Sequence, residues 1–160
     1  MKWLALLGSL LLCYTVAALG GWWTSAELTD WYLSLKRPSI APPNWVFGPV
    51  WSLLYALMAV AAWEIWLTPP SPLRSKALLL FLVQLLLNLL WTWLFFHEHD
   101  IPNALIDIFL LWVAIGSEIV IFWRLQPSAA WLMTPYWAWR ISELRILASE
   151  SGLKLNTELS

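Results

Sequence analysis

Residues 77–96 read ALLLFLVQLLLNLLWTWLFF, twenty residues without a charged side chain. A helix rises about 1.5 Å per residue, so roughly 20 mostly apolar residues are needed to cross the ~30 Å hydrocarbon core of a bilayer. A membrane-barrel strand is about half as long and alternates polar with apolar side chains, which this run does not do. The run therefore predicts a transmembrane helix.

Four further apolar runs of similar length flank this one, at about residues 3–21, 45–67, 101–123 and 128–150. Backbone groups in lipid must find their hydrogen bonds within the protein, so helices are the favoured form for all five runs. The sequence therefore predicts an all-α integral membrane protein. Its single domain, residues 1–160, is expected to be a bundle of five transmembrane helices.

The first run also resembles a cleavable signal peptide, because Lys2 precedes an apolar stretch that ends in the small residues Val16-Ala17-Ala18. Cleavage would leave four membrane spans. Lysine and arginine residues are balanced between the two sides of the expected spans, so the positive-inside rule assigns no orientation.

The composition supports a membrane protein and excludes several functions. Hydrophobic residues make up 61% of the chain and charged residues 12%, about half the charged share of a soluble domain. A net charge of −1 without a Lys/Arg cluster excludes nucleic-acid binding. The single cysteine, Cys13, excludes an internal disulfide and a cysteine-based zinc site. The cluster at residues 97–100, His-Glu-His-Asp, has no second group of ligands, so we expect no metal site and no required cofactor.

The first connection, residues 20–44, is long, whereas the later connections are short and place helices two to five in an antiparallel set. Long loops in compact domains are usually functional or disordered. This one carries Trp22, Trp23, Trp31 and Tyr32, aromatic residues of the kind that prefer the membrane interface. We expect it to cap the mouth of the bundle, with an ordinary aromatic belt as the alternative.

Polar side chains form one stripe on the helix expected at residues 77–96. Gln84, Asn88 and Thr92 follow one another at intervals of four residues, and Trp91 lies beside them. A polar group in hydrocarbon has no water to bond, so the stripe should face the bundle interior or a cavity. Hydrogen bonds that merely hold neighbouring helices together, at about 0.6 kcal/mol each, explain the stripe equally well.

An aromatic ladder lies on the helix expected at residues 45–67. Phe47, Trp51, Tyr55 and Met58 recur at helical spacing and therefore share one face. Rigid aromatic walls suit a flat apolar ligand, although a seam between helices uses the same residues.

Two carboxylates lie within the run at residues 101–123. Asp107 and Glu118 are eleven residues apart, close to three helical turns, and project from nearly the same face. A carboxylate at the bilayer centre costs roughly 2.5–3.5 kcal/mol on insertion scales. The two side chains either have a role in the bundle interior or reach the interface at opposite ends of the helix.

The order and spacing of specific residues resemble one known family, the tryptophan-rich sensory protein (TspO) family, whose mammalian members are the translocator proteins or peripheral benzodiazepine receptors. The resemblance runs from about residue 21 to residue 139. It rests on Trp31-Tyr32, Lys36, Pro38, Pro42-Pro43-Asn44-Trp45-Val46-Phe47-Gly48-Pro49-Val50-Trp51, Leu54-Tyr55, Met58, Trp63, Gln84, Asn88, Trp91, Phe95-Phe96, Ala104, Asp107, Leu111-Trp112, Pro135-Tyr136 and Trp139.

The resemblance implies a function. Members of this family are five-helix bundles that bind tetrapyrroles such as protoporphyrin IX, and in some cases sterols, in a cavity capped by the first connection. By resemblance, Trp51, Tyr55, Asn88, Trp91 and Trp139 would line this cavity, and Trp31, Tyr32 and Pro42 would lie in its lid. We therefore expect a membrane receptor for tetrapyrroles, with Phe47, Gln84, Asp107 and Glu143 as further candidate ligand-binding residues.

Other functions and partners remain open at this stage. Light- and oxygen-dependent breakdown of protoporphyrin, as associated with some relatives, and lipid or sterol transport are the alternatives. The pattern Leu132, Tyr136, Arg140 matches a proposed cholesterol motif that is frequent by chance. Leucine-rich outer faces and the dimers common among relatives suggest a homodimer, although membrane lipid could cover the same faces.

The chain departs from the family pattern at residue 40, which is Ile40 where an aromatic is usual, and again after Trp139, where charged residues replace small apolar ones. Glu143 stands where a small pocket residue is expected, so its negative charge should weaken the binding of a ligand that carries carboxylates. Arg140, Glu143 and Arg145 are costly in hydrocarbon. We therefore expect this end either to lie in a water-accessible mouth or to fray, with the helix ending before Gly152.

Overall fold

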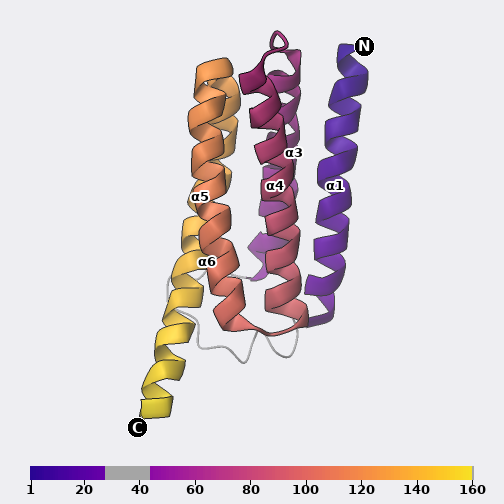
Figure 1. The fold of residues 1–160 in the computed structure, drawn as a ribbon. Coiled ribbons are helices and arrows are strands. Elements are labelled where there is room, and N and C mark those ends of the chain that lie inside the picture. Colours follow the sequence, from indigo (N-terminus) through magenta and orange to yellow (C-terminus); the bar gives the residue numbers. More distant parts are fainter. Residues whose placement is uncertain (28–43, 160) are drawn as a thin grey trace.

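The computed structural model of the chain describes residues 1–27 and 44–159, with the backbone alone for residues 25–27, 44–47 and 150–159. Within these ranges the chain forms long helices joined by short connections (Figure 1), which confirms the all-α bundle. The helices are α1 (Lys2–Glu27), α3 (Asn44–Leu67), α4 (Pro72–Thr92), α5 (Ile101–Leu125) and α6 (Pro127–Leu159), and a π-helical turn, η1 (Trp93–His97), continues α4.

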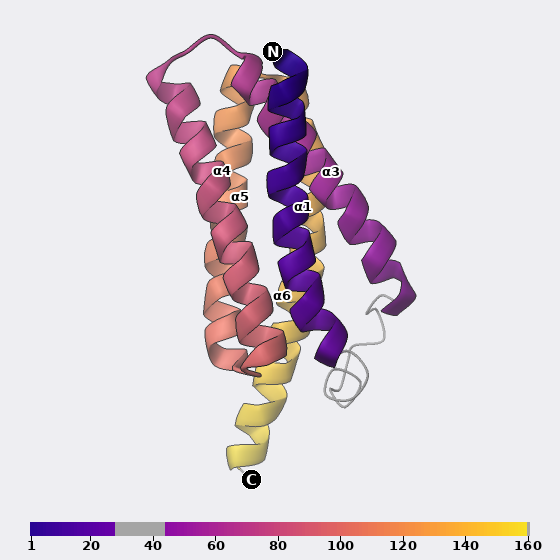
Figure 2. The same ribbon diagram turned by 90° about the vertical axis from the view of Figure 1, so that its right-hand side faces the viewer.

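The helices close into a ring whose order differs from the order in the chain. Helix α1 packs against α3 and α4, α3 packs against α6, α6 against α5, and α5 against α4. Successive helices run in opposite directions, as the two views in Figures 1 and 2 show. The ring places parts of α1, α3, α4 and α6 around one interior, which is where a site between helices can form.

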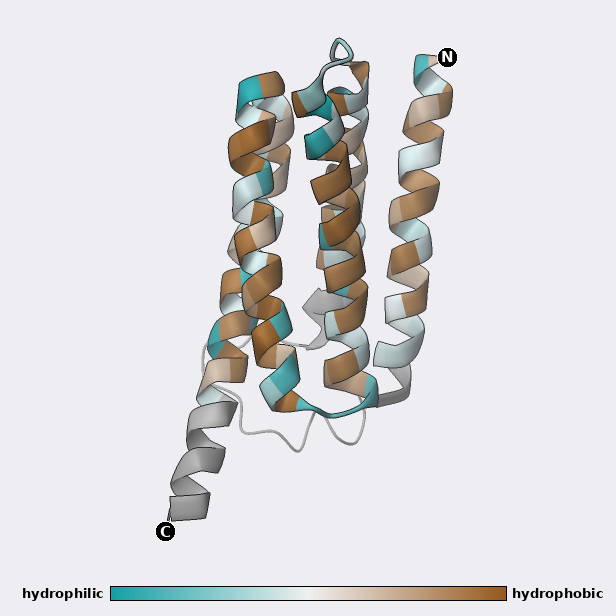
Figure 3. Ribbon diagram, viewed as in Figure 1, coloured by the Kyte–Doolittle hydropathy of each residue, from teal (hydrophilic) through white to brown (hydrophobic). Residues whose placement is uncertain are grey.

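Among the described residues, four helical segments are long and apolar enough to cross a membrane. They are Lys2–Thr24, Gly48–Leu67, Pro72–His97 and Ile101–Leu125. Exposed leucine, isoleucine, valine and aromatic side chains cover the outside of the bundle, and α4 and α5 are strongly hydrophobic along most of their length (Figure 3). A chain with several such segments is a multi-pass integral membrane protein.

Two expected helix boundaries are wrong. Helix α1 continues to Glu27, so Trp22 and Trp23 belong to the helix and not to the first connection. Helix α6 does not end before Gly152 but continues to Leu159. Of the charges that we expected to break α6, Arg140 and Glu143 are buried and paired inside the bundle, whereas Arg145 is exposed. The C-terminal part of α6 extends beyond the ends of the other helices (Figure 1).

The sharp turn between η1 and α5 ends in a helix cap. Asp100 lies at the N-cap position of α5, and its Oδ1 accepts a hydrogen bond from the backbone N–H of Asn103 at 3.2 Å. Pro102 lies in the first turn of α5, where no intrahelical partner is available for an N–H. This turn fixes how α5 returns along α4.

Close packing of α1 against α4 depends on a small residue. A Cβ atom added to the buried Gly20 would lie 3.5 Å from Cγ2 of Thr92 on α4, so a methyl group fits there and a larger side chain does not. We expect Gly20→Leu to destabilise the bundle by about 1–3 kcal/mol through overpacking, measured as a lower melting temperature in detergent micelles. Gly8→Leu is the matched control on the same helix, because an added Cβ at Gly8 meets no atom within 4 Å. Equal melting temperatures for the two variants would contradict the expectation.

Candidate functional site

Four helices and the π-helical turn enclose a cavity of about 320 Å³ towards the end of the bundle where α1 ends and α3 begins. Its walls carry aromatic, small and amide side chains. The lining residues are Tyr14, Ala17, Gly20, Gly21 and Thr24 of α1, Gly48, Trp51, Ser52 and Tyr55 of α3, Asn88, Trp91 and Thr92 of α4, Phe96 of η1, and Glu143 of α6.

The expected aromatic ladder and polar stripe meet at this cavity. Trp51 and Tyr55 lie on α3 with ring centroids 5.6 Å apart, and Asn88 faces them from α4. Nδ2 of Asn88 donates a hydrogen bond of 2.7 Å to the hydroxyl oxygen of Tyr55. Thr92, one turn further along α4, turns its hydroxyl back to the Asn88 carbonyl at 3.0 Å. The stripe thus holds helices together and also lines the cavity.

A buried arginine lies directly behind the cavity wall. Arg140 of α6 is fully buried, and its guanidinium carbon lies 4.6 Å from the Trp51 ring centre and 4.9 Å from that of Trp91. One guanidinium nitrogen donates to Oδ1 of Asn88 and another to Oε2 of Glu143. Cation–π contact with two indoles and two charge-assisted hydrogen bonds offset the cost of burying the charge.

Glu143 occupies the cavity wall as we expected, but its charge is not free. Besides the ion pair with Arg140, its second carboxylate oxygen accepts a hydrogen bond of 3.2 Å from Nε1 of Trp139. Helix α6 therefore turns Arg140 and Glu143 into the bundle and does not expose them on its outer face. The pairing also removes the simple repulsion of an acidic ligand that the sequence alone suggests.

Two candidate residues, Gln84 and Trp139, do not line the cavity. Gln84 is fully buried, accepts a 3.1 Å hydrogen bond from the hydroxyl of Tyr136, and has its Nε2 at 3.7 Å from the sulfur of Met58. Gln84 therefore joins α3, α4 and α6, which is the interhelical role left open by the sequence. Trp139 is half-buried and does not line the cavity, but its Nε1 donates a hydrogen bond to Glu143, which does.

The two carboxylates of α5 both point into the bundle, as their spacing predicts. Asp107 is buried near the positive charge of Arg140 but does not line the cavity. Its Oδ2 has no hydrogen-bond partner among the described residues. Glu118 is fully buried, and neither of its oxygens has a partner within the described ranges. Both side chains therefore lie in the bundle interior and not on its surface.

Some expected site residues fall where the structure gives no account. Trp31, Tyr32 and Pro42, the expected lid, lie outside the described residues, and so does the side chain of Phe47. Within the described ranges, no three His, Cys, Asp or Glu side chains gather closely enough to hold a metal ion.

The sequence analysis missed two contributors to the cavity. The first is α1, whose small residues Ala17, Gly20 and Thr24 follow one face at intervals of three and four residues. That spacing is the usual signal of close helix contact in membranes and could have indicated this face. The second is Arg140, which lies behind the cavity wall and which the sequence identified only as an energetic cost and as part of the cholesterol motif. Because Tyr136 and Arg140 are both fully buried, the cholesterol motif is not a lipid-facing surface.

Comparison with known proteins finds similarity to one family of membrane proteins. Residues 9–142 match the TspO/MBR family. The chain is 36% identical over 110 residues to Protein CrtK of Rhodobacter capsulatus, covering 68% of this chain and 69% of that protein. It is 34% identical over 142 residues to the tryptophan-rich protein TspO of Archaeoglobus fulgidus, covering 87% and 90% of the two chains. It is 35% identical over 123 residues to the human translocator protein, covering 75% and 72%.

The buried ion pair predicts a coupled response to mutation. Removing one partner of such a pair costs about 3–5 kcal/mol, whereas replacing both with apolar residues is often close to neutral. We expect Arg140→Met and Glu143→Met each to lower the melting temperature in detergent micelles, and the double variant to recover most of the loss. Arg145→Met, an exposed site on the same helix, is the control and should leave the melting temperature unchanged. A double variant whose loss equals the sum of the two single losses would show that the pair is not coupled.

Proposed function

Because the chain belongs to the TspO/MBR family, we propose that it is a membrane receptor that binds protoporphyrin-like tetrapyrroles in the cavity between α1, α3, α4 and α6. One observation carries the proposal beyond family membership. An aromatic wall and a buried cation occur together at this cavity, which is the combination that recognises a flat apolar ring system with carboxylate substituents.

The aromatic wall supplies the apolar part of the binding energy. Trp51, Tyr55 and Trp91 come from two helices and are fixed by packing and by the Asn88 hydrogen bond, so their orientation is set before a ligand arrives. Burial of apolar surface contributes about 25 cal/mol per Å², and a large ring system buries enough of it to exceed the cost of association.

The cation supplies the specificity. Nε of Arg140 and Nε1 of Trp91 are buried donors with no acceptor among the described residues. A carboxylate at the cavity wall can accept from both, and it would share the guanidinium with Glu143. A sterol has no such group, so this arrangement favours an acidic tetrapyrrole over a sterol in the same cavity.

A whole tetrapyrrole has to widen the cavity. Its volume of about 320 Å³ lies at the lower end of the ~300–1,000 Å³ range of ligand sites. The guanidinium of Arg140 lies against the rings of both Trp51 and Trp91, so a ligand ring that stacks on these two indoles would displace it. Binding and rearrangement of the ion pair are therefore linked.

Removal of the aromatic wall should weaken binding. We expect Trp51→Ala to raise the dissociation constant for protoporphyrin IX about tenfold, because a stacking contact and its buried area are lost. The measurement is the shift of the porphyrin absorbance band during titration of the purified protein. Trp123→Ala, on the exposed face of α5, is the control. Binding that does not saturate, or that is equal in all three proteins, would contradict the proposal.

Removal of the internal counter-ion should improve recognition of an acidic ligand. In Glu143→Gln, Arg140 loses its carboxylate and becomes available to the ligand, so we expect protoporphyrin IX to bind about tenfold more tightly. The dimethyl ester of the same porphyrin, which has no carboxylate, should show no gain. An equal gain for acid and ester would mean that Glu143→Gln acts through space in the cavity and not through charge.

Light-dependent breakdown of the bound porphyrin is the second candidate, because Trp51 and Trp91 both line the cavity and would lie against an excited pigment. In such a reaction the pigment supplies the chemistry and the protein supplies the position. Under illumination in air, turnover predicts faster bleaching with the intact protein than with Trp51→Ala at equal porphyrin occupancy. Equal bleaching rates would leave binding alone.

A further inference from the structure

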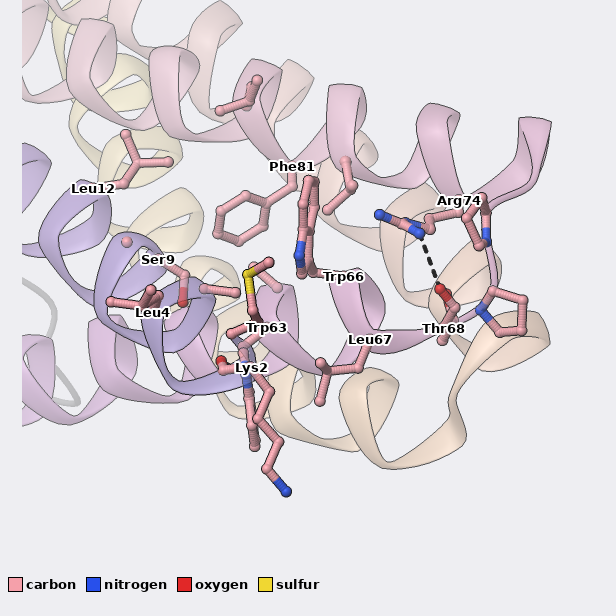
Figure 4. A pocket seen from close by; sticks show the side chains of 18 residues that line it. Lys2, Leu4, Ser9, Leu12, Trp63, Trp66, Leu67, Thr68, Arg74 and Phe81 are labelled. Atoms are coloured by element: carbon pink, nitrogen blue, oxygen red, sulfur yellow. Dashed lines mark hydrogen bonds between the residues drawn. The ribbon is translucent and has the colours of Figure 1, made fainter.

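A second and larger cavity lies at the opposite end of the bundle, where α1 begins, α3 ends and α4 begins. It is a groove of about 940 Å³ lined by the first turns of α1, the last turns of α3, the connection at residues 67–71 and the first half of α4 (Figure 4). It shares no residue with the cavity around Trp51. The position at the end of the membrane spans places its mouth at the level of lipid headgroups.

The inner part of the groove is apolar and open. Leu4, Leu12 and Leu82 are exposed along it, and the buried Phe81 lies at its back. Gly8 faces the groove with no atom within 4 Å of an added Cβ, so a glycine keeps this part of the surface hollow. Such a surface fits acyl chains. An acyl chain binds this groove with little selectivity, because the surrounding lipid tails are equally apolar. Selectivity has to come from the mouth.

The mouth of the groove carries cations and indoles. Arg74 extends from α4 with its guanidinium carbon 4.7 Å from the Trp66 ring centre, and Nη1 donates a 3.1 Å hydrogen bond to the carbonyl of Thr68 (Figure 4). A guanidinium has five N–H donors, and this is the one hydrogen bond that the Arg74 side chain makes among the described residues. Lys2 lies across the groove on α1, where its backbone carbonyl accepts a 2.7 Å hydrogen bond from Nε1 of Trp63. Its ammonium group lies 5.2 Å from the ring centre of Trp3, at the rim and not between the walls of the groove.

The charges around the groove are not balanced by acids. Among the described residues that line it, Lys2 and Arg74 are charged and none is acidic. Glu64, an acid of α3 near this end, does not line the groove, and its Oε2 accepts a hydrogen bond of 2.8 Å from Ser128 on α6. A second copy docked here about a twofold axis would face Lys2 and Arg74 with the same cations, so self-association through this face is unfavourable.

We propose that this groove binds an anionic phospholipid, whose phosphate lies against the Arg74 guanidinium and whose acyl chains lie along α1 and α4. Trp63 and Trp66 stand at the level where indoles border headgroups. Each cation near an anionic headgroup gives about a fivefold preference over a zwitterionic lipid, equivalent to about 1 kcal/mol per charge.

The test measures lipid binding to the full chain by native mass spectrometry from detergent, with phosphatidylglycerol and phosphatidylcholine of identical acyl chains as probes. The intact protein should prefer phosphatidylglycerol, and Arg74→Gln should reduce this preference about fivefold. Lys76→Gln removes the same charge from the same helix at an exposed position outside the groove, and it should leave the preference unchanged. Equal affinity of the intact protein for both lipids, or equal losses in the two variants, would overturn the proposal.

A second pair of variants tests the acyl-chain part of the groove. Gly8→Leu fills the hollow and should weaken both lipids without changing their ratio, whereas Ala18→Leu, exposed on the same helix and lining neither cavity, should have no effect. Unchanged lipid binding in Gly8→Leu would show that the chains lie elsewhere. A shift from monomer to dimer in Arg74→Gln, without a change in lipid preference, would assign the groove to a second copy and also overturn the proposal. The helical circular dichroism of each variant confirms that it is folded.

Discussion

The pairing of a buried guanidinium inside a membrane bundle is the interaction on which the arrangement of this protein depends. Arg140 lies on the helix that is least apolar, yet it is fully buried. Its bonds to Asn88 and Glu143 and its contacts with Trp51 and Trp91 bring partners from α3, α4 and α6 to one point. A charge in hydrocarbon is tolerated only where the bundle satisfies it, so the positions of these three helices are tied to the pair.

The same pair connects stability with ligand recognition. The residues that satisfy Arg140 are the residues that line the cavity, so a ligand that competes for the guanidinium necessarily changes an interaction that holds α6 in place. In a site lined by small apolar side chains alone, a ligand adds contacts and removes none. At the site that we propose, binding would exchange one set of partners for another, and the affinity would reflect the difference between the two sets.

The fold was largely predictable from the sequence, because a membrane leaves few alternatives to helices of about twenty apolar residues. The faces of α3 and α4 that meet at the cavity were predictable for the same reason, since polar and aromatic side chains at spacings of three and four residues must turn inward. The role of Arg140 was not predictable. Its cost in hydrocarbon is visible in one helix alone, whereas its partners Asn88 and Trp91 lie on another helix, and only packing brings them within reach. The course of α6 past Gly152 was misjudged for this reason.

The charged side chains at the two ends of the bundle are neutralised in different ways, because they lie at different depths in the protein. At the end that holds the Trp51 cavity, Arg140 and Glu143 cancel each other inside the protein, away from water and salt. At the other end, Arg74 and Lys2 lie at the surface without acidic neighbours in the groove. A buried charge needs a counter-ion that the protein itself supplies, because none is available in hydrocarbon. A charge at the interface can take its counter-ion from the membrane, and an open cationic groove is stable in an anionic leaflet without any further protein group.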